Sequence, residues 1–195
     1  MKKLVKALQT LLSRKKLLGD RIHLRPPKRR DALKWQKLRL ASKEFLIPWE
    51  PSWDSFSCSR RAYFRYLKNS NYLANMDRAY FFLIFKNKDK DLLGGINIGN
   101  VRRGVSQNAS IGYWVGSMHS RKGYMYEALK ILIPSLFLDL RLNRVEAAIL
   151  EENIASKNLL KKIGFKKEGK LRNYLKINGQ WRDHIMYSLL EDDLN

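Results

Sequence analysis

The sequence predicts a mixed α/β (α+β) protein, a single domain in which helices and strands are arranged around one sheet. Two observations lead to this prediction. The spacing of apolar residues switches several times between the period of strands and the longer period of helices. In addition, a chain of 195 residues that is 45% hydrophobic and 11% aromatic can bury a sizeable core. This composition excludes a disordered or low-complexity protein.

Residues 1–18 predict a basic amphipathic helix ahead of the main domain, which we assign to residues 19–195. No acidic residue appears before Asp20. Such a helix could pack on the body of the protein, lie on RNA or lipid, or act as an import sequence. The leucines that share its apolar face are Leu4, Leu8, Leu11 and Leu12.

The first elements of the main domain are defined by alternation, helical spacing and proline. Alternating residues predict a strand over 21–25, and the two prolines that follow end it because proline cannot donate to a ladder. A helix is expected over 31–40, with Asp31 as its N-cap. Residues 45–53 hold a Trp-Glu pair between two prolines, which predicts a stiff loop, and a helix is expected over 59–68. The leucines with helical spacing in the first helix are Leu33, Leu38 and Leu40.

The rest of the chain predicts three strands and then alternating elements. Short polar turns between the three strands favour an antiparallel meander. Gly164 stands where a helix C-cap is expected, and Asn178-Gly179 is a strong hairpin signal. The expected elements are strands at 80–85, 92–98 and 109–115, a helix at 124–137, a strand at 144–150, a helix at 155–163, and strands at 165–177 and 181–189.

The charge of the chain points to an anionic partner. Lys and Arg number 39 against 18 Asp and Glu, so the formal net charge is +21. The excess is concentrated, because residues 1–43 contain 15 basic and only two acidic residues. A surface of this kind is attracted to RNA, DNA or anionic lipid. A basic composition that serves only solubility is the alternative.

The sequence argues against a membrane-spanning or metal-dependent protein. No apolar run approaches ~18 residues, so no transmembrane segment is expected. The only cysteine, Cys58, cannot form an internal disulfide, which favours a reducing cytoplasmic location. No metal site is expected, because the histidines are scattered and keep no ligand spacing with Cys58. They are His23, His119 and His184.

A candidate phosphate-binding loop over 118–125 joins a strand to a helix. Unpaired backbone N–H groups and the dipole at a helix start favour an anion there. Gly123 allows a tight curl, and Arg121 and Lys122 could neutralise a pyrophosphate. The loop lacks the glycines of a Walker loop or a dinucleotide fingerprint. A plain strand-to-helix turn with solvated basic residues is the alternative.

Several motifs follow one another along residues 20–193. They are Phe45–Pro51, Gly123–Leu129, Asn153 with Ser156, Gly164-Phe165, and Gly169 with Asn178–His184. Together they resemble the GNAT acetyltransferases and, within them, the RimJ/RimL group of ribosomal-protein-alanine N-acetyltransferases. The first and last motifs are most similar to the RimJ branch. The resemblance implies the GNAT fold, a single twisted, mixed and mostly antiparallel sheet flanked by helices.

The resemblance also implies acetyl-CoA as co-substrate and no metal. The pantetheine would lie along the strand at 111–115 and the pyrophosphate on the loop at 120–125. Ser120 and Met125 depart from the usual residues of the family, and Met125 introduces a bulky side chain. Asn153 matches the asparagine that helps to hold the cofactor, and its alternative role is a helix cap. The implied cofactor-binding residues are Tyr113, Trp114, Val115, Arg121, Lys122, Gly123, Tyr124, Met125, Asn153 and Ser156.

The expected acceptor needs little help from a base. An N-terminal α-amine has a pKa of roughly 7.7–8.0, so an appreciable fraction is neutral near pH 7. Many GNAT enzymes protonate the leaving thiolate with a tyrosine, but Leu160 stands at that position. Ser156 fits the serine used in the RimL-like branch, with helix capping as the alternative. Glu50 is our candidate to hold and deprotonate the amine, and Trp49 to wall the peptide pocket. The alternatives are that Glu50 is a solvated carboxylate and that Trp49 is a core aromatic residue.

These features lead to one main hypothesis and two others. The main hypothesis is an enzyme that acetylates the N-terminus of a ribosomal protein. The second is a GNAT enzyme for a small amine such as a polyamine or an aminoglycoside, which the charge of +21 disfavours because it repels a polycation. The third is a ribosome- or RNA-binding assembly factor with incidental activity.

Overall fold

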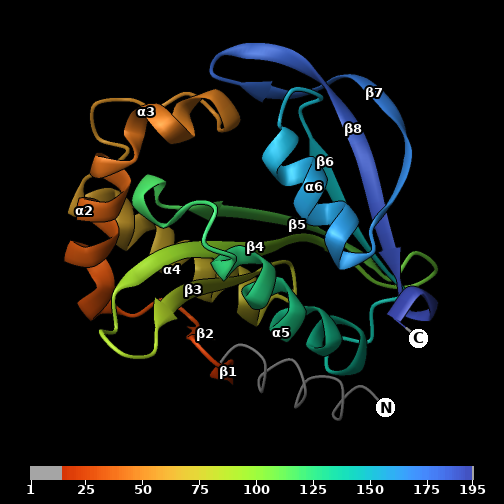
Figure 1. The fold of residues 1–195 in the computed structure, drawn as a ribbon, viewed down its shortest axis with the longest axis horizontal. Coiled ribbons are helices and arrows are strands. Elements are labelled where there is room, and N and C mark those ends of the chain that lie inside the picture. Colours follow the sequence, from red (N-terminus) through yellow and green to blue (C-terminus); the bar gives the residue numbers. More distant parts are fainter. Residues whose placement is uncertain (1–14, 195) are drawn as a thin grey trace.

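A computed structural model describes residues 15–194 (Figure 1). One sheet runs through it in the order β1-β2-β3-β4-β5-β6-β8-β7. Every neighbouring pair in this sheet is antiparallel except β5 and β6, so the predicted mixed, mostly antiparallel sheet is confirmed. The strands are β1 (Leu17–Leu18), β2 (Ile22–Arg25), β3 (Tyr80–Lys86), β4 (Leu92–Arg102), β5 (Asn108–Val115), β6 (Arg144–Ile149), β7 (Lys166–Ile177) and β8 (Gln180–Leu190).

Helices cover both faces of the sheet (Figure 1). The α-helices are α2 (Ala32–Ala41), α3 (Lys43–Leu46), α4 (Arg60–Asn75), α5 (Tyr124–Leu138) and α6 (Ile154–Ile163). Short 3₁₀ turns are η1 (Arg29–Asp31), η2 (Ile47–Trp49), η3 (Ser117–His119) and η4 (Glu191–Leu194). The predicted turn residues are confirmed, because Gly164 ends α6 with φ +109° and Asn178-Gly179 joins β7 to β8 with both φ angles positive.

Three predictions about the N-terminal part need correction. Leu17 and Leu18 pair with β2 as a strand and do not continue a helix, while residues 1–14 of the predicted basic helix lie outside the described residues. The helix after Pro27 forms as expected, but Leu33 and Leu40 are exposed and the buried residues are Trp35 and Leu38. The helix that begins after Ser59 continues to Asn75, beyond the predicted end.

Asp31 is not the side-chain cap of α2. Its carboxylate accepts two hydrogen bonds from the Arg25 guanidinium, at 2.6 and 2.7 Å, and one from the backbone N–H of Lys28 at 2.8 Å. Arg25 and Asp31 are both buried, so this bidentate pair fixes η1 against the end of β2. The carboxylate therefore anchors the turn ahead of the helix.

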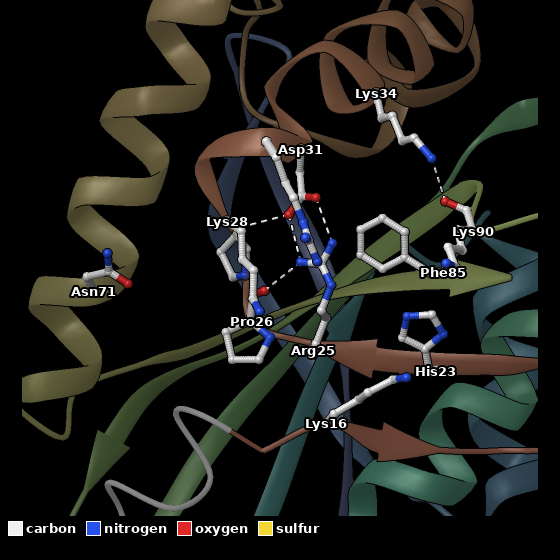
Figure 2. Close-up of a pocket in the computed structure, with 12 residues that line it drawn as sticks. Lys16, His23, Arg25, Pro26, Lys28, Asp31, Lys34, Asn71, Phe85 and Lys90 are labelled. Atoms are coloured by element: carbon white, nitrogen blue, oxygen red, sulfur yellow. Dashed lines mark hydrogen bonds and ion pairs between the residues drawn. The ribbon is translucent and has the colours of Figure 1, made fainter. Parts of the chain in front are cut away.

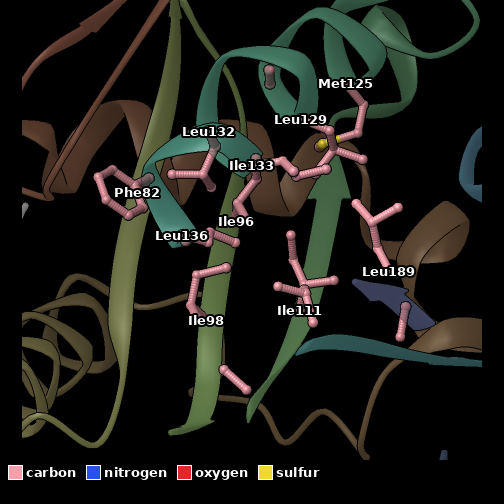
Figure 3. Close-up of a cluster of buried hydrophobic side chains, with 14 of the residues drawn as sticks. Phe82, Ile96, Ile98, Ile111, Met125, Leu129, Leu132, Ile133, Leu136 and Leu189 are labelled. Carbon is pink, nitrogen blue, oxygen red and sulfur yellow. The ribbon is translucent and has the colours of Figure 1, made fainter. Parts of the chain in front are cut away.

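The core has two layers, one on each face of the sheet. Along β3, Phe82 and Ile84 pack with α5, whereas Leu83 and Phe85 pack with α2 and α4, as the two-residue period of a strand requires. Figure 3 shows the apolar stripe of α5 facing the central strands. Leu129, Leu132 and Leu136 in that stripe are fully buried.

The pairing of β5 with β6 is short. Their parallel register holds only from Asn108 to Ser110, against Arg144 to Glu146. Beyond these residues β5 continues to pair with β4, and β6 with β8, so the two central strands run apart (Figure 1). The sheet therefore opens between the last five residues of β5 and the end of β6.

Shortening a core side chain should cost far more than shortening an exposed one. We expect Leu132→Ala to lower the free energy of unfolding by about 2–5 kcal/mol, because it leaves a cavity under α5. The matched Leu33→Ala, at a helical leucine that is 53% exposed, should change it by less than about 0.5 kcal/mol. Urea unfolding measures both. Equal losses would contradict the assignment of α5 to the core.

Candidate active site

The opening between β5 and β6 exposes backbone polar groups. From Ile111 to Val115, β5 has a ladder partner on its β4 side only. Backbone N–H and C=O groups at a sheet edge require partners, which water or a ligand must supply. An extended molecule that carries amide groups can therefore pair with this edge.

The loop after β5 forms a turn whose backbone N–H groups are suited to an anion. Arg121 and Gly123 have φ angles of +58° and +77°, which curl the backbone ahead of α5. The backbone N–H groups from Arg121 to Tyr126 have no hydrogen-bond acceptor among residues 15–194. These donors and the helix dipole create a positive site, and the exposed Arg121 and Lys122 add to it. The Met125 side chain is buried in the core, so its bulk leaves the turn open.

Arg21, just before β2, holds this turn in place. The Glu127 carboxylate accepts hydrogen bonds from the backbone N–H and from Nε of Arg21, both at 2.8 Å. The same guanidinium donates to the carbonyl of Lys122 at 3.1 Å and lies 4.9 Å from the centre of the Tyr124 ring. Glu127 therefore has a structural role, and it ties the loop to the start of β2.

Residues from β5 and α6 meet inside the opening. The Oδ1 atom of Asn153 accepts a hydrogen bond from the N–H of Ser156 at 3.0 Å, so Asn153 caps α6 and the Ser156 hydroxyl is not needed for the cap. The Tyr113 hydroxyl is buried and has no hydrogen bond of good geometry within residues 15–194. Burial raises the pKa of Tyr113 to about 12, and the neighbouring Ser156 side chain acts in the opposite direction. Tyr113 and Ser156 are therefore neighbours.

Leu160 lies one turn further along α6 and is fully buried. An aliphatic side chain carries no proton to donate, and Ser156 is the one residue of α6 with a hydroxyl group.

A second cluster forms around Arg39, which the sequence reasoning missed. Its guanidinium donates to both carboxylate oxygens of Glu50, at 2.7 and 2.6 Å. Glu50 also accepts from Nε1 of Trp53 at 2.9 Å. The same guanidinium lies 4.2 Å from the ring centre of Trp53 and 5.0 Å from that of Trp114. Glu50 is therefore engaged in an ion pair and is not a solvated carboxylate. The sequence feature that could have indicated Arg39 is Trp35, which stands one helical turn before it. In the structure the Arg39 guanidinium lies 5.6 Å from the centre of the Trp35 ring.

The two remaining predicted residues of β5 have different roles. The Trp114 side chain packs with the α2 and α4 layer, so it points away from the α6 side of the sheet. Val115 packs against the main core. Only the backbone of Trp114 faces the opening, as expected for a strand whose side chains alternate.

Trp49 and Glu50 lie beside the β7–β8 hairpin. The Glu50 carbonyl accepts a hydrogen bond from the backbone N–H of Asn178 at 2.9 Å. The Trp49 side chain is 37% exposed, so it is available as a wall. The structure thus brings Tyr113, Ser156 and Asn153 together in one group. Glu50 and Trp114 belong to a second group, because both contact Arg39.

The described residues contain neither a metal-binding cluster nor a membrane-spanning helix. No group of three or more His, Cys, Asp or Glu side chains in residues 15–194 is arranged to hold a metal ion. Within the same residues, no helix has both the length and the apolar character needed to cross a bilayer.

The fold and the site define an acyltransferase of the GNAT class. The GNAT acetyltransferase domain matches residues 21–166. The ribosomal protein uS5-alanine N-acetyltransferase of Escherichia coli is 33% identical over 178 residues, which cover 91% of this chain and 92% of that protein. Two solved structures share the fold with TM-scores of 0.85. RimJ of Mycobacterium smegmatis in complex with CoA-disulfide is 34% identical and covers 89% of this chain and 83% of its own. A ribosomal-protein-S5-alanine acetyltransferase of Vibrio fischeri is 27% identical, and the match covers 93% of this chain and 99% of that protein.

The chain therefore belongs to the GNAT acetyltransferase family, with RimJ/RimL proteins among its relatives.

Glu50 should matter for stability because it neutralises Arg39. We expect Glu50→Ala to lower the free energy of unfolding by about 1–3 kcal/mol, since it leaves a charged donor without its acceptor. Glu44→Ala, at an exposed glutamate in α3, should have little effect. Urea unfolding compares the two variants. Wild-type stability in Glu50→Ala would contradict the ion-pair role.

Proposed function

We propose that this enzyme transfers the acetyl group of acetyl-CoA to the N-terminal α-amine of a ribosomal protein by direct attack, in the cytoplasm. The observation that carries the proposal is the unpaired edge of β5, which leads directly into a turn with unpaired N–H groups. This arrangement suits a ligand with amides at one end and a pyrophosphate at the other. Relatives whose names give ribosomal-protein-alanine acetyltransferase activity support the acceptor.

Each part of the coenzyme has a matching group. The edge from Ile111 to Val115 pairs with the amides of the pantetheine arm, and the backbone N–H groups of residues 121–126 hold the pyrophosphate. Arg121 and Lys122 supply positive charge there. Asn153 uses its carbonyl oxygen for the helix cap, which leaves its amide nitrogen to donate to the arm.

The chemistry needs one proton donor near the sulfur. The neutral amine attacks the thioester carbonyl carbon, the C–S bond breaks, and the thiolate takes a proton from Ser156 Oγ. The nitrogen of the tetrahedral intermediate loses its extra proton to water as the amide forms, and this proton returns through water to Ser156, so the enzyme returns to its starting state. Tyr113 lies beside this hydroxyl. Positioning supplies most of the remaining acceleration.

The acceptor enters beside Trp49 and Glu50. Because the Glu50 carboxylate is paired with Arg39, we assign it to holding the entry loop and orienting the amine, and a water relay removes the proton. Trp49 walls the peptide path. The basic surface of the chain guides the enzyme to the ribosome or rRNA.

The acceptor class can be tested directly. We expect a peptide with an N-terminal alanine to gain one acetyl group when it is incubated with acetyl-CoA and the enzyme, and spermidine to react much more slowly. The α-amine is less often protonated near pH 7 than an alkylamine with a pKa near that of lysine, about 10.4. Mass spectrometry detects the acetyl shift, and the same peptide with a blocked N-terminus is the control. Acetylation of spermidine but not of the peptide would overturn the proposal.

Ser156→Ala tests the proton donor. We expect kcat to fall by about 10²-fold, the lower end of general-acid effects, with a nearly unchanged KM for acetyl-CoA. The fold should survive, because Asn153 caps the backbone N–H of residue 156 and not its hydroxyl. The matched control is Ser106→Ala, because Ser106 is exposed in the loop between β4 and β5, 50 residues before Ser156 in the sequence. Unchanged turnover in Ser156→Ala would remove this hydroxyl from the mechanism.

A further inference from the structure

A separate cavity lies between β2, η1, α2 and α4, at the other end of the sheet from β7 (Figure 2). Its volume is about 710 Å³. The cavity shares no residue with the candidate active site. Within the sheet, β3 and β4 lie between β2, which lines the cavity, and β5. Six basic side chains and one acidic side chain line it among the described residues. The basic ones are Lys16, Arg25, Lys28, Arg30, Lys34 and Lys90.

The only acid on this lining, Asp31, is already occupied. Its two oxygens accept hydrogen bonds from the Arg25 guanidinium and from the N–H of Lys28. None of the five other basic side chains forms an ion pair with a carboxylate within residues 15–194. The cavity therefore contains a concentration of positive charge that nothing in the described structure neutralises.

The floor of the cavity is rigid. The Arg25 guanidinium lies 4.1 Å from the centre of the Phe85 ring, and the His23 ring stacks on the same phenylalanine at 5.5 Å. His23 also shares a hydrogen bond of 2.9 Å with Asn87. Burial, and then the charges of Lys16, Arg25 and Lys90, lower the pKa of His23, so at neutral pH the ring adds no charge. A preformed floor reduces the entropy that a ligand loses on binding.

The elements that border the cavity, η1, α2 and α4, carry further exposed cations. Arg29, which stands between the lining residues Lys28 and Arg30, lies 5.4 Å from the ring centre of Phe64 in α4. A free phosphate would need only the cavity, whereas a polyanion would also use these further cations. They are Arg29, Lys37, Arg61, Arg65 and Lys68.

We propose that this cavity, with the basic helix surface beside it, binds the phosphodiester backbone of single-stranded RNA. A concave site with lysines on its rim fits a strand that can bend into it better than it fits a flat lipid surface. The choice of RNA over DNA rests on the proposed function, because the acceptor is a ribosomal protein. RNA held here would dock the enzyme while leaving the acetyl-transfer site open.

The test uses three exposed cations of the cavity. We compare wild type with the triple variant Lys28→Ala, Arg30→Ala, Lys34→Ala by fluorescence anisotropy with a labelled oligouridylate over a range of salt concentrations. The matched control removes three exposed cations from β7, Lys167→Ala, Arg172→Ala, Lys176→Ala, and so makes the same change in net charge. We expect at least about a tenfold weaker affinity in the cavity variant and a log–log salt slope that is shallower by about 2, at ~0.7 per lost phosphate contact. The control should bind nearly as wild type does.

Equal losses in both triple variants would overturn the proposal, because bulk charge would then explain the binding. So would binding to phosphatidylglycerol vesicles without binding to RNA, or full displacement of the RNA by equimolar inorganic phosphate. The cavity variant should still acetylate a free peptide at the wild-type rate. If neither protein acetylates the peptide but the cavity variant alone loses RNA, the proposed enzymatic function fails and the RNA site stands.

Discussion

The architecture of this enzyme depends on where the pairing between β5 and β6 ends. After three residues of parallel ladder, each strand stays with its outer neighbour, and the sheet opens at its centre. A sheet normally closes such an edge, because unpaired backbone groups are costly to bury. Here a ligand or water must supply the missing partners, so the opening offers backbone hydrogen-bonding groups to a bound molecule. These groups do not depend on which side chains β5 carries.

The donor side and the acceptor side of the site are joined by a single guanidinium. Arg39 comes from α2, holds the loop around Glu50 through two hydrogen bonds, and stacks on Trp114 of β5. The same loop is fastened to the β7–β8 turn through the Glu50 carbonyl. Three segments that are distant in sequence therefore keep a fixed spacing, which a reaction controlled by positioning requires.

Local signals predicted most of the elements, and long-range contacts explain what they missed. Gly123, Gly164 and Asn178-Gly179 mark backbone conformations that few residues adopt, so they were recognisable from the sequence alone. Leucine spacing predicted α2 but misplaced its buried face, because α4 and β4 select Trp35 instead. The pairing of Glu50 with Arg39 follows from tertiary packing, and no spacing rule indicates it. Likewise, only the register of β5 decides that Tyr113 neighbours Ser156 while Trp114 contacts Arg39.

The distribution of charge also follows from the need to keep two anions apart. Coenzyme A carries phosphates of its own, so a concentrated cluster of lysines next to the opening would compete for them. At the cofactor turn, the structure relies mainly on oriented N–H groups with two basic side chains. It collects its unpaired cations around β2 and α2, with β3 and β4 between them and β5. Backbone donors discriminate by geometry and cations attract by charge, so separating them would let one small domain bind both of the proposed partners, a specific cofactor and a polyanion.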